Sequence, residues 1–159
     1  MKTVFLAALL SATAMIACNA LAQSATAGQW RPLANTLYVL SPSEPSKTYL
    51  GASIDDRTKD MAINIFDLSN EVCKGGEDTP VQDSSPISIN GKFVKFKTVC
   101  INGMHILQPA SDAGKHFLNT AVISGHPVIV DEGDGIALHY PGSTIAPIRS
   151  KLLSARNAM

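Results

Sequence analysis

The run ISINGKFVKFKTVCINGMHIL, residues 87–107, decides the fold of this 159-residue chain. It holds two Asn-Gly pairs, Asn90-Gly91 and Asn102-Gly103, and each pair stands between stretches that favour β-strands. Asn-Gly is the strongest short signal for a hairpin, because the type I′ turn needs a positive φ at both central residues. The run therefore predicts a three-stranded antiparallel meander with two tight turns.

The two turns also predict which side chains share a face of the meander. A two-residue turn fixes the register, so that Ile87 faces Val94 and Cys100 faces His105, and side chains alternate along each strand. The face predicted to line the core carries Ile87, Ile89, Val94, Phe96, Thr98, Cys100 and Leu107. The opposite face carries Ser88, Phe93, Lys95, Lys97, Val99, Ile106 and Gln108.

Strand and helix patterns continue on both sides of the meander. Apolar and β-favouring runs predict strands at 36–40, 49–54, 61–68, 127–130 and 136–140. A helix is expected over 111–124, with Ser111 as its N-cap and Gly125 at its end, and a second helix over 147–155 begins at Pro147. This order predicts an α+β fold, with a mainly antiparallel sheet and helices packed on one face.

The N-terminal 22 residues have the pattern of a secretory signal peptide. Lys2 is followed by an apolar run over 4–10 and by the small-x-small triplet Ala20-Leu21-Ala22. We therefore expect cleavage before Gln23 and a single exported domain over 23–159, either periplasmic or secreted. The alternative is a lipoprotein tethered through Cys18, because residues 15–18 loosely resemble a lipobox.

Two cysteines, Cys73 and Cys100, remain after the predicted cleavage. In an oxidising compartment they are expected to form a disulfide, which would hold the polar segment 70–86 against the sheet. The alternative is a free Cys100 that uses His105 as its base in nucleophilic catalysis.

Charge and motifs exclude several classes of function. The chain has 13 basic and 13 acidic residues, so nothing in its net charge favours a nucleic acid as partner. No familiar catalytic or phosphate-binding motif occurs, and the sequence indicates no cofactor. The alternative function is a small hydrolase or divalent-metal enzyme, whose candidate ligands are His126, Asp131, Asp134 and His139. A solvated turn would also have this composition.

The preferred hypothesis is a binding module that contacts a protein or an envelope component, such as an inhibitor or an accessory subunit. Its predicted contact surface is the outer face of the meander, because aromatic, aliphatic and cationic side chains mix there as they do at interfaces. The expected contact residues are Phe93, Lys95, Lys97, Ile106 and Gln108. The alternative surface is the acidic segment 70–83.

Overall fold

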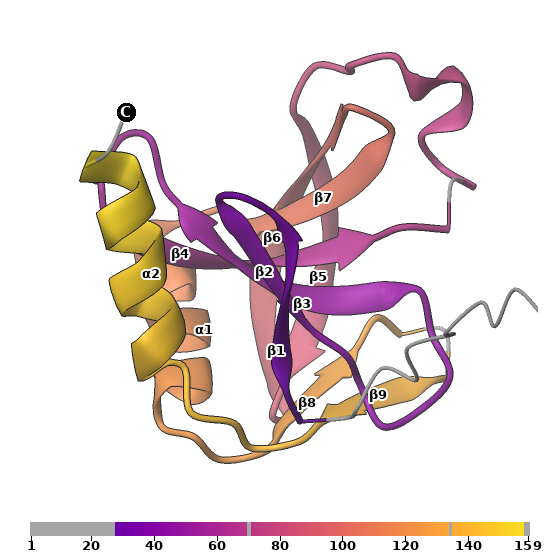
Figure 1. The fold of residues 1–159 in the computed structure, drawn as a ribbon. Coiled ribbons are helices and arrows are strands. Elements are labelled where there is room, and N and C mark those ends of the chain that lie inside the picture. The colour runs from indigo at the N-terminus through magenta and orange to yellow at the C-terminus, as the bar shows by residue number, and fades with distance from the viewer. Residues whose placement is uncertain (1–27, 70, 134, 158–159) are drawn as a thin grey trace, which may run out of the picture.

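Nine strands form one antiparallel sheet in a computed structural model that describes residues 28–69, 71–133 and 135–157 (Figure 1). The strands are β1 (Trp30–Ala34), β2 (Leu37–Leu40), β3 (Thr48–Ile54), β4 (Met61–Asp67), β5 (Gln82–Ile89), β6 (Lys92–Ile101), β7 (Met104–Pro109), β8 (Val128–Asp131) and β9 (Ala137–Tyr140). Their order across the sheet is β1-β2-β3-β4-β7-β6-β5-β8-β9. The predicted signal peptide, its cleavage site and Cys18 lie outside the described residues.

Two helices, α1 (Asp112–Ile123) and α2 (Ala146–Asn157), lie on the same side of the sheet (Figure 1). The Ser111 side chain accepts a hydrogen bond from the Gly114 backbone N–H at 3.1 Å, which satisfies one of the unpaired amides at the start of α1. Both helices bury their apolar stripes against strands, so the prediction of an α+β fold with a mainly antiparallel sheet is confirmed.

Strands β5, β6 and β7 pair around the two Asn-Gly turns. Asn90 and Asn102 have φ values of 51°, and the glycine after each also has a positive φ, as a type I′ turn requires. Ile87 lies opposite Val94, and Cys100 lies opposite His105.

Two strands differ from the sequence-based expectation by more than one or two residues. β5 begins at Gln82, inside the segment expected to be a loop, because a β-bulge between Ser84 and Ile87 lets the strand continue past Pro86. β1 was not predicted, since the sequence before Ala34 shows little alternation. It is ordered by pairing with β2.

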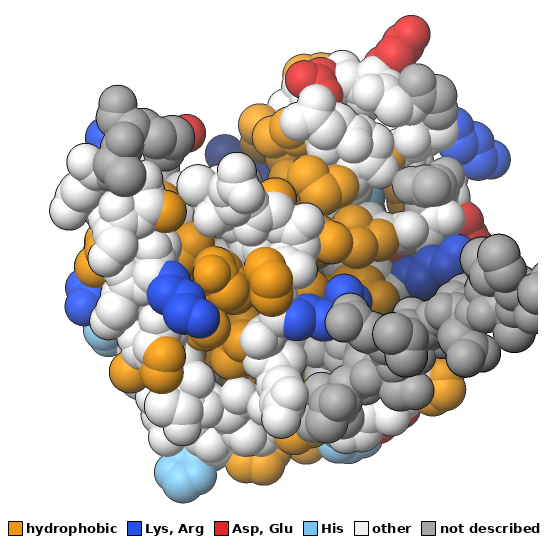
Figure 2. All heavy atoms as spheres, in the orientation of Figure 1, with side chains coloured by type: hydrophobic (Ala, Val, Ile, Leu, Met, Phe, Trp, Pro, Cys, Tyr) orange, Lys and Arg blue, Asp and Glu red, His pale blue; other side chains and the backbone are white. Residues whose placement is uncertain are grey.

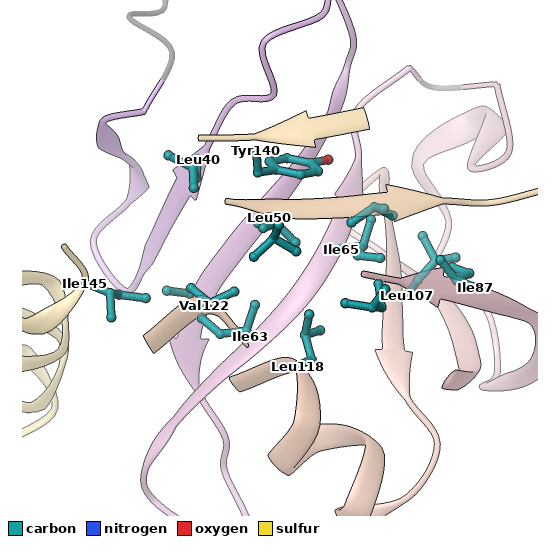
Figure 3. Close-up of a cluster of buried hydrophobic side chains, with 14 of the residues drawn as sticks. Leu40, Leu50, Ile63, Ile65, Ile87, Leu107, Leu118, Val122, Tyr140 and Ile145 are labelled. Carbon is teal, nitrogen blue, oxygen red and sulfur yellow. The ribbon is translucent and has the colours of Figure 1, made fainter. Parts of the chain in front are cut away.

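The main core lies between the inner face of the sheet and the helices (Figure 3). Leu118 and Val122 of α1 point toward Ile63 and Leu50 of the sheet, and all four side chains are buried. Burying a side chain of this kind stabilises the fold by about 1.5–3 kcal/mol. Tyr140 of β9 joins the same cluster from the far end of the sheet.

The two ends of the sheet approach each other. The backbone N–H of Ser43, in the connection between β2 and β3, donates to the carbonyl of His139 on β9 at 2.7 Å. The Tyr140 hydroxyl donates to the carbonyl of Thr48 at 3.1 Å. Burial of this hydroxyl raises the pKa of Tyr140. The sheet therefore wraps around its inner core.

A second apolar cluster lies on the outer face of the sheet. Its buried members are Leu37, Val39, Phe66, Val99 and Ile106. A Cβ atom at Gly51 would overlap the Phe66 ring, so the ring packs directly on the glycine backbone. Figure 2 shows hydrophobic side chains gathered over the β1–β3 part of the sheet. The outer face is therefore not open along its whole length.

The described residues include no helix that is long and apolar enough to span a bilayer.

Candidate docking surface

A disulfide between Cys73 and Cys100 holds the acidic segment against β6, with a Cα–Cα distance of 5.7 Å. Hydrogen bonds add to this attachment. Thr79 pairs with Cys100 twice, through its backbone N–H at 3.0 Å and through its hydroxyl oxygen at 2.9 Å. The Asp78 carboxylate accepts a hydrogen bond from the Asn102 N–H at 2.9 Å. The predicted bond is thus present, and the segment behind it is anchored at several points.

The disulfide removes the alternative of a Cys100–His105 nucleophilic pair. Cys100 has no free thiol, so His105 cannot activate it. The His105 ring instead hydrogen-bonds the Thr98 hydroxyl through Nε2 and lies 3.8 Å from the Asp67 carboxylate through Nδ1. This arrangement satisfies polar groups where β4 ends and β7 begins.

The candidate metal ligands have other partners or lie apart in the structure. His139 pairs with Glu44, with 2.6 Å between Nδ1 and the carboxylate, and its backbone N–H also donates to that carboxylate. This N–H holds the pKa of Glu44 below its ordinary value. Asp131 caps its own turn and His126 is exposed after α1, whereas Asp134 lies outside the described residues. Within the described ranges, no three metal-ligating side chains come together.

The carboxylate of Asp55 holds the turn between β3 and β4 to helix α1. One Asp55 oxygen accepts the N–H groups of Arg57 and Thr58, both at 2.9 Å, and the other accepts Lys115 of α1 at 3.1 Å. These bonds, the one from Thr58 first, lower the pKa of Asp55 to about 2. Asp55 is therefore ionised at neutral pH and has a structural role.

The outer face of β6 presents most of the predicted contact residues to solvent. Phe93 is 76% exposed, which makes it the most exposed large hydrophobic side chain among the described residues. Lys95 and Lys97 follow at alternate positions and are exposed, and Gln108 lies opposite Lys97 on β7 and is half-buried. Three cationic or aromatic side chains therefore share one open stripe.

The prediction that Ile106 belongs to this surface is wrong. Ile106 is only 7% exposed and packs with Val99 and Phe66 in the outer cluster. Burial of the outer face begins where β7 pairs with β4, and Ile106 lies directly opposite Phe66 there. The open part of the outer face of β6 therefore covers residues 93–97.

A groove of about 430 Å³ runs between this end of β6 and the start of α1. Its lining includes Phe93 and Lys95 of β6 and Phe117 of α1. The Lys92 ammonium lies 4.6 Å from the centre of the Phe117 ring, within the range of a cation–π contact. Lys92 and Phe117 were not predicted as site residues, because hairpin register says nothing about where a helix docks. The cluster of three lysines after Asn90-Gly91 was the available signal.

Comparison with protein families, with curated proteins and with solved structures finds no match for this chain. Its function must therefore be inferred from the residues and their arrangement.

Proposed function

We propose that this protein is an exported, non-catalytic binding module whose partner docks on the outer face of β6 around Phe93. An inhibitor of an exported enzyme and an accessory subunit of an envelope assembly both fit this description. The observation that carries the proposal is the exposure of Phe93, at 76%, beside a groove. Aromatic side chains are enriched at the centres of interfaces, and exposed apolar patches with polar rims mark binding sites.

The lysines support the same surface. Lys95 and Lys97 lie on the Phe93 side of β6, where they would steer a partner of negative potential. Gln108 lies opposite Lys97 and can donate and accept hydrogen bonds at the rim.

Export is part of the proposal and rests on residues 1–22, with Gln23 as the expected first residue of the mature chain. The buried disulfide is compatible with an oxidising compartment. Intact mass of the purified protein tests this directly. A mass that begins at a lipidated Cys18 would replace the free exported form with an anchored one.

Affinity capture from the cell's own envelope and medium fractions tests the surface. We expect Lys95→Glu with Lys97→Glu to reduce the captured partner several-fold, most strongly at low salt, because exposed charges are screened within about 10 Å at 0.1 M. The matched control is Lys47→Glu with Lys151→Glu, which makes the same charge change at exposed lysines elsewhere.

The control variant should retain the partner. If the β6 variant folds and also retains it, the surface is not on β6, and the acidic segment over 71–83 becomes the candidate.

A further inference from the structure

We propose that the groove between β6 and α1 binds an extended acidic segment of the partner. One apolar side chain of that segment would pack against Phe93 at the rim of the groove, and a carboxylate two residues away would pair with Lys95. This inference rests on the proposed function and specifies the chemistry of the partner.

The groove has an apolar floor of small residues. Ala110, Ala113 and Gly114 line it, and a Cβ atom at Gly114 would lie 3.0 Å from a methyl carbon of Val94. The helix therefore approaches β6 closely. The side chains at these three positions are no larger than a methyl group, so they leave the groove open. An aliphatic or aromatic side chain that enters here would remove the exposed Phe93 ring from water.

The charge beside the groove is positive and uncompensated. No ion pair within the described residues involves Lys92 or Lys95, and the Lys92 ammonium lies over the Phe117 ring. Lys97 lies opposite Asp83 on β5 and does not line the groove. Lys92 and Lys95 are therefore the cations available to a carboxylate.

The nearest acid on α1 does not cancel this charge. Asp112 begins the helix, and its carboxylate pairs with Arg57 at 3.0 Å. Arg57 comes from the turn between β3 and β4. Its positive charge compensates the Asp112 carboxylate, which therefore does not neutralise the lysines of the groove.

The spacing along β6 fits an extended segment. Phe93 and Lys95 are two residues apart on one strand, so their side chains are about 6.6 Å apart along it. An extended peptide places its alternate side chains at the same spacing. β6 pairs with β5 along residues 92–94 and with β7 only from Phe96 onward, and the Lys95 carbonyl accepts the Ala110 N–H at 2.8 Å. The contacts proposed here are made by the side chains of Phe93 and Lys95.

A second copy of this chain fits less well. Its own acidic segment over 71–83 carries exposed Val72 and Val81, which gives it suitable chemistry. The disulfide and the hydrogen bonds of Asp78 and Thr79 nevertheless hold that segment on its own β6. It is not free to lie extended in another groove.

Titration with synthetic peptides, followed by amide chemical shifts of the mature domain, tests the inference. The probe is a decapeptide of Ser, Asp and Glu with one central Phe that stands two residues from an Asp. One control peptide replaces Phe with Ser, and another replaces every acid with Lys. We expect shifts confined to the groove, and weaker binding as salt rises from about 0.05 to about 0.3 M.

Matched variants test the aromatic contact and the charged contact of the groove separately. Phe93→Ser should weaken peptide binding about fivefold or more, and Lys95→Gln about threefold. Lys47→Gln is the control and should change it less than about twofold, since this exposed lysine lies between β2 and β3 and does not line the groove.

Equal binding of the Lys-containing peptide, equal effects of the two lysine variants, or shifts away from the groove would overturn the inference. So would binding to phosphatidylglycerol vesicles in place of the peptide, or self-association that depends on Phe93 in sedimentation experiments. If the peptide fails but capture of the native partner still depends on Phe93 and Lys95, the docking surface stands and only the partner chemistry is wrong. If neither peptide binding nor capture of the native partner depends on Phe93 and Lys95, the proposed function also fails.

Discussion

Replacing both half-cystines, Cys73→Ser with Cys100→Ser, should lower the free energy of unfolding by about 3–4 kcal/mol. The bond joins residues separated by 27 positions. Cross-linking a loop of that length removes chain entropy from the unfolded state that is worth about 3.5 kcal/mol at 25 °C. Domains of this size have a total stability of about 5–15 kcal/mol, so the loss would be a substantial part of the whole.

The surroundings of the bond affect the estimate in two opposite ways. Both sulfurs belong to buried residues, so serine at either position leaves a polar group that needs a partner, which adds to the loss. The hydrogen bonds of Thr79 and Asp78 remain, and they retain part of the contact between the acidic segment and β6. The variant should therefore stay folded with a looser segment.

Urea unfolding followed by the fluorescence of the single tryptophan, Trp30, measures this change. The oxidised wild type, the reduced wild type and the serine variant are compared. We expect the last two to share a lower midpoint and a larger m value, because an unfolded chain without the cross-link exposes more surface. A loss below about 1 kcal/mol, or two free thiols in native exported protein, would refute the reasoning.

Two other substitutions test the packing and the electrostatics. Gly51→Ala should cost about 1–3 kcal/mol in the free energy of unfolding, since the new methyl group overlaps the buried Phe66 ring; an unchanged thermal midpoint would contradict this. Asp55→Asn should cost about 1–2 kcal/mol at pH 7, because the pKa of Asp55 is about 2 in the folded protein and about 3.8 ordinarily. A lowered pKa stabilises the fold above about pH 4, and this contribution disappears as the pH falls toward 2. Unfolding measured from pH 7 to pH 2 should therefore show the gap closing, and a constant gap would exclude the ionic contribution of the pairing with Thr58 and Lys115.

Local signals in the sequence were sufficient for the meander and the disulfide. Asn90-Gly91 and Asn102-Gly103 encode their own turns, and a two-residue turn leaves one register for the strands it joins. The predicted cleavage leaves two cysteines, so the prediction of their pairing needed no knowledge of distant contacts.

Contacts between distant segments account for what the sequence did not predict. Ile106 and Val99 are apolar on the face expected to be open, and this was the available signal that the outer face is covered in part. The cover comes from strands far away in the chain, including Phe66 of β4. The groove beside Phe93 likewise depends on where α1 docks, which hairpin register does not determine.

Photo-crosslinking in the producing cells tests the central claim most directly. A photoreactive benzoylphenylalanine replaces Phe93, which is 76% exposed, and separately replaces two other exposed apolar residues, Ile129 on β8 and Val81 in the acidic segment. If the partner docks on the outer face of β6, position 93 should give one discrete adduct, and positions 129 and 81 should give little. A discrete adduct at position 81 alone, or equal adducts at all three positions, would contradict the placement of the docking surface at Phe93.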